Sequence, residues 1–274
     1  MAKTKKTDLV VPSNDNTLPD YLQGSYKTGL EALGRDDFKV QRIKLLQPMS
    51  PEVRAFSGKA LPSEFWHTGA NVSLGREFFA TPILVNKKVI LFPPRDSGDD
   101  RFILAYSRDG KSWDTGGNQK YDVTLKDKSK VVWDTSIPPS RMTDFGTSNP
   151  ADTNSQPAAM LYYEYLLYLR DNSDLSPVVL SAFRTSIPNA KSFNTYLASR
   201  KGVPINANII KFVSLEKSEN KNVWHIIGFQ PAGNAPREIF ELTEGMKERY
   251  ADYDVQIDKD DMQAESTTLK SEDI

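Results

Sequence analysis

The sequence has no cysteine and only two histidines, His67 and His225. The absence of cysteine excludes disulfide frameworks, thiolate zinc sites, iron–sulfur clusters and cysteine nucleophiles. Two histidines leave little for a zinc site or a histidine-dependent triad, and neither lies beside acidic residues at metal-ligand spacing. We therefore expect neither a cofactor nor an enzyme.

Long hydrophobic runs are also missing, since uninterrupted apolar stretches such as residues 89–92 are only a few residues long. A membrane-spanning helix needs about 20 apolar residues. The first six residues are basic but no apolar stretch follows them, so we expect no secretory signal. With 38% apolar and 26% charged residues over 274 positions, the composition is typical of a globular, cytoplasmic protein with no membrane contact.

Charge is distributed unevenly along the chain. Residues 252–274 contain eight acidic residues and two lysines, so this segment carries -6 and the remainder carries +5. The segment is polar and has no glycine or proline, and we expect an acidic disordered tail. Such a tail can compete with a polyanion for the basic body or bind partner proteins. A solubilising end with no specific role remains the alternative.

The hydrophobic patterns predict an α+β chain that is mainly β. Strands are expected near residues 38–46, 158–170, 177–185, 207–215 and 223–230, and a pair at 77–85 and 88–92 turning at Asn86–Lys87, with Pro82 favouring an edge position. Helices are expected at 18–33, 186–200 and 235–250. Short strands are expected near 102–107, 121–125 and 130–133.

A helix between the third and fourth strands of a five-stranded antiparallel set is the order of an OB-fold barrel, whose face commonly binds oligonucleotides. The predicted organisation is a flexible basic arm at 1–19, a single OB-like domain at 20–251 with a long inserted loop region at about 93–157 and a C-terminal helix, and the acidic tail at 252–274.

Motifs for catalysis are weak. The triplet Gly110–Ser112 resembles the end of a phosphate-binding loop, but position 105 is alanine where that motif requires glycine. Asp96, Asp99, Asp100 and Asp109 could bind a divalent cation, yet they lack calcium-loop spacing and are typical of turns. No Gly-x-Ser-x-Gly motif supports a serine hydrolase.

Basic and aromatic residues occur together instead. Proteins that bind single strands without sequence preference follow the phosphates with a positive groove and stack the bases on flat side chains. Packing in the core is the alternative for each aromatic residue, because strands favour such residues in any case. The candidate nucleic-acid-binding residues are Arg108, Lys111, Trp113, Lys120, Tyr121, Lys130, Trp133, Tyr162, Tyr168, Arg184, Lys191, Arg200, Lys201 and Lys211.

Six short segments are distinctive: 36–47 (DDFKVQRIKLLQ), 50–53 (SPEV), 65–69 (FWHTG), 109–113 (DGKSW), 145–150 (FGTSNP) and 175–177 (LSP). Together they resemble a group of tailed-bacteriophage and prophage proteins, some of which are considered single-stranded DNA-binding proteins. The resemblance covers most of residues 30 to 230, and no binding residues are carried over from the group. The basic body with an acidic tail is also similar to phage single-stranded DNA-binding proteins of replication, although their tails commonly end in a bulky aromatic residue and this one ends in Ile274.

These observations predict a non-enzymatic, sequence-nonspecific single-stranded DNA-binding protein of phage replication or recombination, acting in the host cytoplasm. Its tail would modulate DNA binding and could contact phage or host replication proteins. A virion or assembly protein is the main alternative. A metal-dependent nuclease using the aspartates of residues 96–109 is a further one.

Overall fold

The computed structural model describes residues 40–94, 101, 103–116, 118–220 and 222–251. The chain divides into two units between Lys39 and Val40, and all described residues belong to the second unit. The arm predicted at 1–19, the helix predicted at 18–33 and the tail predicted at 252–274 lie outside the described residues.

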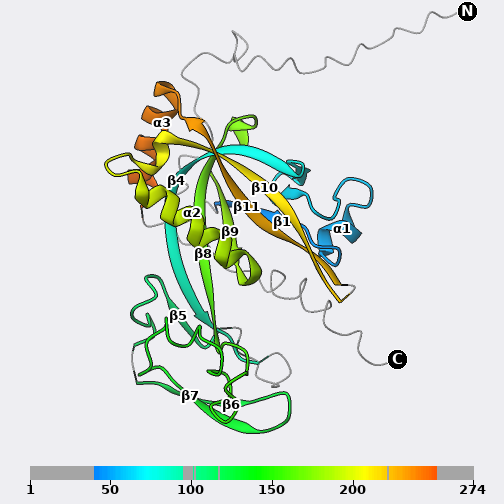
Figure 1. Cartoon of the computed structure of the whole chain (residues 1–274), viewed down its shortest axis with the longest axis vertical. Helices are drawn as coiled ribbons and strands as arrows, with labels where there is room; N and C mark the ends of the chain where they lie inside the picture. The colour runs from blue at the N-terminus through cyan, green and yellow to red at the C-terminus, as the bar shows by residue number, and fades with distance from the viewer. Residues whose placement is uncertain (1–39, 95–100, 102, 117, 221, 252–274) are drawn as a thin grey trace, which may run out of the picture. The chain divides into compact units, whose positions relative to one another are not determined.

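Strands dominate the described part of the chain (Figure 1). The strands are β1 (Gln41–Leu45), β2 (Phe65–His67), β3 (Val72–Ser73), β4 (Glu77–Leu91), β5 (Ala105–Ser107), β6 (Lys120–Thr124), β7 (Lys130–Asp134), β8 (Ala159–Leu169), β9 (Val178–Phe183), β10 (Asn208–Glu219) and β11 (Asn222–Asn234). The helices are α1 (Pro51–Ala55), α2 (Ile187–Ser199) and α3 (Arg237–Arg249), with 3₁₀ turns η3 (Ser173–Leu175), η4 (Arg184–Ser186) and η5 (Ile205–Ala207).

Nine strands form one sheet in the order β11-β10-β4-β8-β9-β1-β2-β3, and β5 pairs with β4 beside this path. The sheet is curled: Gln47, just after β1, reaches the outer edge of β11, where its side-chain amide bonds both the N–H and the C=O of His225 at 2.9 Å. The mainly β class is thereby confirmed. The OB-fold identity is not confirmed, and β1 and β9 run parallel whereas the predicted barrel is antiparallel throughout.

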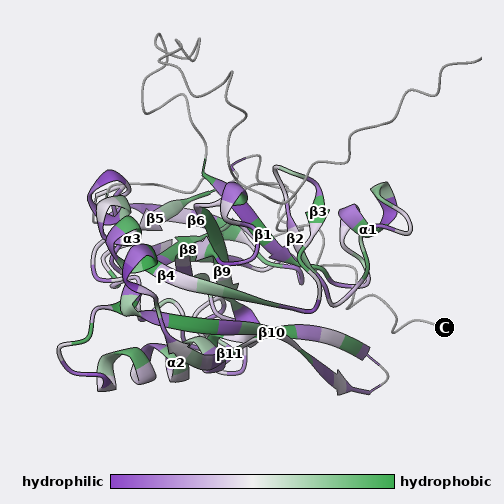
Figure 2. Ribbon diagram, turned by 90° about the horizontal axis from the view of Figure 1, so that it is seen from above, coloured by the Kyte–Doolittle hydropathy of each residue, from purple (hydrophilic) through white to green (hydrophobic). Residues whose placement is uncertain are grey.

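Two helices cover opposite faces of the sheet. Successive side chains of a strand point to opposite faces, so Tyr165 and Leu167 of β8 pack with Phe193 of α2, whereas Leu166 packs on the other face with Met246 of α3. Figure 2 shows α2 beside the β10–β11 hairpin, which extends past its neighbours. Strand β10 pairs with β4 only over Ile210–Val213, so the rest of the hairpin is a two-stranded ribbon.

The strand pair predicted around Asn86–Lys87 is wrong, because β4 runs without interruption from Glu77 to Leu91. Both turn residues pair with β8, at Glu164 and Tyr163. Pro82 does not mark an edge strand either: β4 lies between β10 and β8, and the β4–β8 register shifts between Pro82 and Leu84. A proline without an N–H is tolerated at such an irregularity.

The segment between β4 and β8 forms a lobe with its own core. The two-stranded sheet β6–β7 and the loop before β8 enclose buried Trp113, Tyr121, Trp133 and Met142. Val89 and Leu91 of β4 contribute to the same core, which is distinct from the core beneath α2. Strands β4 and β8 therefore pass through two hydrophobic cores in succession.

Among the described residues, no helix is both long and apolar enough to span a bilayer.

Candidate nucleic-acid interface

The aromatic rings predicted to stack on bases are mostly buried. Trp113, Tyr121, Trp133 and Tyr162 are between 3% and 9% exposed. The Trp113 Nε1–H donates to the Ile137 carbonyl at 2.9 Å, and the Trp133 Nε1–H donates to the Ser148 carbonyl at 3.0 Å. These rings tie the loops of the lobe together and present no free face to a base in this structure.

Tyr121 and Tyr162 are also fixed by contacts within the protein, one through its hydroxyl and the other through its ring. The Tyr121 hydroxyl donates to the Leu104 carbonyl at 2.7 Å, and the Tyr162 ring packs 5.1 Å from the Phe183 ring. Tyr168 is half-buried against the core beneath α3.

The face of β8 that carries Tyr162 also holds buried charged side chains. Glu164 is fully buried and pairs with the equally buried Lys88 Nζ at 2.8 Å. A buried charge needs a close partner of opposite sign, and the neighbouring strand supplies one. Arg42 and Ser181, also buried, lie on the same face and approach each other to 3.4 Å.

The predicted cations are spread over several surfaces. Arg108 pairs with Asp114 at 3.3 Å and lies over the Tyr106 ring. Lys120 and Lys130 are exposed on the outer face of β6–β7. Lys191 is exposed on α2, and Lys201 is exposed just after it.

Two other predicted cations have structural partners. Arg200 binds the side chains of Asn208 and Asn234. These bonds join the end of α2 to the first residue of β10 and the last residue of β11. Lys211 pairs with Glu77 at 2.7 Å. These contacts do not bring Arg200 or Lys211 together with the other predicted cations.

One row of residues lies between the two cores on the face that α2 covers. Lys87 of β4 is opposite Tyr163 of β8, which is opposite Ala182 of β9. Tyr165 and Leu167, further along β8, belong to the core beneath α2, whereas Leu161 packs against the lobe core. Tyr163 packs at the edge of the core beneath α2, and Lys87 lies opposite it with Cβ atoms about 5 Å apart.

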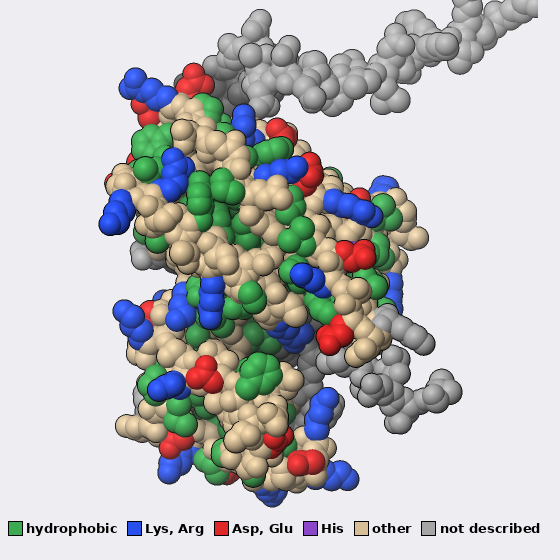
Figure 3. Space-filling view, in the orientation of Figure 1, with side chains coloured by type: hydrophobic (Ala, Val, Ile, Leu, Met, Phe, Trp, Pro, Cys, Tyr) green, Lys and Arg blue, Asp and Glu red, His purple; other side chains and the backbone are tan. Residues whose placement is uncertain are grey.

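Two further cations lie near this row, toward the lobe. On the lobe side, a Cβ added at Gly110 would stand 2.7 Å from Lys87 Cε, so Lys87 lies against the turn that also carries exposed Lys111. Exposed Arg184 follows the end of β9, one residue beyond the Tyr162–Phe183 pair and therefore toward the lobe end of β8. We call Lys87, Lys111, Tyr163 and Arg184 the basic waist. Figure 3, seen from the α2 side, shows Lys and Arg side chains gathered between the sheet-bearing part and the lobe.

The turn beside the basic waist is rigid. Asp109 Oδ1 accepts the N–H groups of Lys111 and Ser112 at 2.7 and 3.1 Å, and these bonds hold the pKa of Asp109 below its usual range. The Asp109 side chain therefore stabilises the turn, which is a common role of aspartates in glycine-rich loops. Burial raises the pKa of Tyr163, so its hydroxyl stays protonated and can donate a hydrogen bond.

Sequence reasoning missed two residues of the basic waist. Lys87 stood in a predicted turn, and Tyr163 was not among the candidate residues. Its neighbours on the same face of β8, Tyr165 and Leu167, are buried. Tyr163 is only partly buried because it falls between two cores, and no sequence pattern marks where one core ends.

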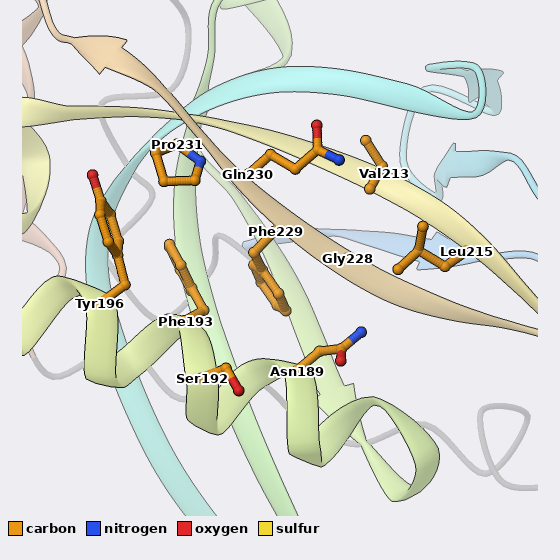
Figure 4. A pocket seen from close by; sticks show the side chains of 10 residues that line it. All are labelled: Asn189, Ser192, Phe193, Tyr196, Val213, Leu215, Gly228, Phe229, Gln230 and Pro231. Carbon is orange, nitrogen blue, oxygen red and sulfur yellow. The ribbon is translucent and has the colours of Figure 1, made fainter.

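A shallow groove lies elsewhere, between α2 and the edge strand β11 (Figure 4). Its volume is about 290 Å³. The rings of Phe193 and Phe229, which help to line it, stack with their centroids 4.6 Å apart. Asn189 donates to the Ile227 carbonyl, and Ser186 accepts the Ile227 N–H. These contacts protect the sheet edge, as edge strands require. None of the predicted binding residues lines this groove.

The described residues contain no group of three or more His, Asp or Glu side chains that could hold a metal ion. Of the aspartates proposed for a metal, Asp96, Asp99 and Asp100 lie outside the described residues.

A family model described as "Pam3 phage gp34-like protein" matches residues 11–256, which is most of the chain. No curated protein and no solved structure matches the chain.

Proposed function

The chain belongs to the Pam3 phage gp34-like family, and from this premise we propose that it binds single-stranded DNA without sequence preference at the basic waist, in phage replication or recombination. The observation that carries the proposal is that Lys87 lies opposite the partly buried Tyr163, with exposed Lys111 in the turn against Lys87 and exposed Arg184 just after β9. This arrangement replaces the predicted one, in which bases stack on the tryptophans.

The chemistry fits a single strand better than a duplex. A partly exposed tyrosine ring offers a face on which an unpaired base can stack, and such a stack contributes about 1–3 kcal/mol whatever the base. The cations neutralise phosphates, and the released counterions drive binding. In a duplex the bases are already stacked on each other, so the tyrosine has nothing to contribute.

Salt dependence tests the electrostatic part. Three phosphate contacts, at about -0.7 each, predict a slope of about -2 for log K against log salt. Fluorescence anisotropy with labelled oligo-dT, at several salt concentrations, measures this slope. Replacing Lys87, Lys111 or Arg184 with glutamine should lower its magnitude by about 0.7 each. The matched controls are Lys120→Gln and Lys130→Gln, on the outer face of the β6–β7 lobe, which should leave the slope unchanged.

Tyr163→Leu tests the stacking part. It should weaken oligo-dT binding by about 1–3 kcal/mol and leave the salt slope unchanged, because no charge is removed. The control is Tyr162→Leu on the opposite face, compared with wild type at matched folded fraction. Equal loss in both variants, or equal affinity for duplex DNA, would refute the basic waist as the site.

The acidic segment 252–274 enters this proposal through its charge of -6. A tethered polyanion competes with DNA for the same cations, so deleting the segment should tighten oligo-dT binding at low salt. The effect should fade at high salt as screening shortens the range of the attraction. Unchanged affinity at low salt would remove the competition while leaving the basic waist itself untouched.

Phe145 favours a second candidate, a virion or assembly protein. Its side chain is 68% exposed and is followed by Gly146, whose φ of +84° and N–H bond to Ser155 O at 2.7 Å fix the loop. Ile137 and Val132 of the same lobe are 44% and 53% exposed. Rigidly displayed apolar side chains suit contact with another protein. Mass spectrometry of purified particles separates the candidates, since a replication protein should be absent from them.

A further inference from the structure

A second cavity of about 380 Å³ lies between the β10–β11 ribbon and the turn at residues 61–63. Gln47 places the two walls together: its amide binds His225 on β11, while the carbonyl of the preceding residue, Leu46, accepts the N–H of Ser63 at 2.9 Å. Ser214 of β10 and Arg76, just before β4, complete the lining, and the Ser214 N–H donates to the Arg76 carbonyl.

Three of the lining side chains have a buried polar atom with no hydrogen-bond partner. They are Ser63 Oγ, Ser214 Oγ and His225 Nδ1. Ser63 and His225 are only 5% and 9% exposed. A buried polar group without a partner costs about 1–3 kcal/mol, so three around one cavity require an explanation. A serine hydroxyl can turn among three staggered positions about its Cα–Cβ bond.

The charges of the lining indicate the kind of ligand. Arg76 is exposed and forms no ion pair with any described residue. A guanidinium recognises the oxygens of a phosphate through two parallel hydrogen bonds. Burial lowers the pKa of His225, so the ring is neutral near pH 7 and retains one N–H to donate. Glu216, across the ribbon from His225, is the one acid in the lining, and it is exposed.

We propose that this cavity binds a phosphate group, held by Arg76 and hydrogen-bonded by Ser63, Ser214 and His225. The volume suits a free phosphate or the phosphate end of a nucleotide. This site is separate from the basic waist and does not depend on DNA binding there.

The two histidines make the site measurable in the intact chain. His225 lines the cavity, whereas the His67 Nδ1 accepts the Ala70 N–H at 2.9 Å away from it. NMR of the two imidazoles during titration with inorganic phosphate should show a saturating shift of the His225 signals, with His67 unchanged. The same titration with thymidine monophosphate distinguishes the sources: tighter binding assigns a nucleotide, and equal affinity assigns free phosphate.

Two variants of opposite sign sharpen the test. Arg76→Gln should weaken phosphate binding at least about tenfold, because a charged hydrogen-bond donor is lost. Glu216→Gln should tighten it, because a like charge is removed. Arg237→Gln, at an exposed arginine of α3, is the matched control and should change nothing. The proposal fails if His225 does not move, if both histidines move linearly together, or if correctly folded Arg76→Gln binds phosphate as the wild type does.

Discussion

The core beneath α2 and the core of the lobe are built on different principles. Beneath α2, Phe78, Phe193, Phe212 and Phe229 contact one another, with ring centroids as close as 4.6 Å. In the lobe, Trp113, Tyr121 and Trp133 each donate a hydrogen bond to a backbone carbonyl of a loop or strand end. Where paired strands already satisfy the backbone, most of the rings are hydrocarbon, and buried Tyr165 donates to a side chain, Asn194 of α2. Where loops predominate, the polar atoms of the rings bind backbone carbonyls as well as filling the core.

This difference explains why a tryptophan between glycine and charged residues is not an exposed stacking platform here. Trp113 stands in such a sequence, yet it is 7% exposed because its indole anchors the turn at Ile137. In this loop-rich lobe, a tryptophan whose sequence neighbours suggest exposure is buried because its ring and its N–H hold the loops together. The partly exposed ring, Tyr163, comes instead from the middle of a regular strand.

The largest effect is expected beneath α2. Phe212→Ala removes a fully buried ring that stacks on Phe78 at 4.9 Å. It should lower the free energy of unfolding by about 3–5 kcal/mol, because the cavity left in a dense core collapses only partly. Urea unfolding followed by far-UV circular dichroism measures the loss. Phe145→Ala, at the exposed ring of the lobe, is the control and should stay within about 0.5 kcal/mol of wild type.

A smaller and more local effect is expected in the lobe. Trp133→Phe keeps an aromatic ring but removes the N–H bonded to Ser148, which should cost about 1–3 kcal/mol. Hydrogen exchange should accelerate across residues 120–157 while β9 and β10 keep their protection, since the two cores are distinct. Uniform acceleration over the whole sheet would show that the cores unfold as one unit.

Thr147 is a weaker anchor in the same loop. Its hydroxyl accepts the Ala158 N–H at 2.9 Å and lies 2.6 Å from the Asp144 carbonyl, to which it can donate. Thr147→Val should cost about 0.5–1.5 kcal/mol by chemical denaturation. Thr195→Val is the control: its exposed hydroxyl donates only within α2, to the Lys191 carbonyl, so the expected change is smaller. Equal losses would contradict the role of side-chain bonds in the lobe.

The sequence predicted the elements that depend on local patterns. The helix expected at 186–200 is α2 at Ile187–Ser199, and the helix expected at 235–250 is α3 at Arg237–Arg249. Pro188 in the first turn of α2 and the apolar stripe of Phe193 and Leu197 are signals within a few residues. The β10–β11 hairpin is also confirmed, although it is longer than predicted.

Elements set by distant partners were not predictable. An Asn-Lys pair between two apolar runs resembles a turn, but β8 pairs with β4 across those residues and keeps the strand extended. The same limit applies to the candidate site. Whether Tyr162 or Tyr163 is exposed depends on what packs above each face of β8, and those neighbours come from residues far away in the chain.

Lowering the pH should destabilise the sheet beneath α2 before it destabilises the lobe, and this is the smallest effect of the series. Both histidines lie outside the lobe, and burial lowers the pKa of each below the usual 6.5. Between the lowered pKa and 6.5, the unfolded chain binds protons that the folded chain does not, so stability falls as the pH drops below about 6.5. His67→Gln and His225→Gln should each flatten this first decline in urea unfolding measured from pH 7 to 5.

The lobe should respond only at lower pH. Hydrogen bonds from Ser129 and Ser136 hold the pKa values of Asp127 and Asp134 below the usual 3.8. A carboxylate with a lowered pKa contributes stability that is present above 3.8 and is lost as the pH falls through the folded value. Hydrogen exchange resolved by region should therefore show the sheet beneath α2 loosening first and β6–β7 later. If β6–β7 loosens between pH 6.5 and 5, the charges of the lobe and those of the sheet are coupled, and the separation of the two cores does not extend to their electrostatics.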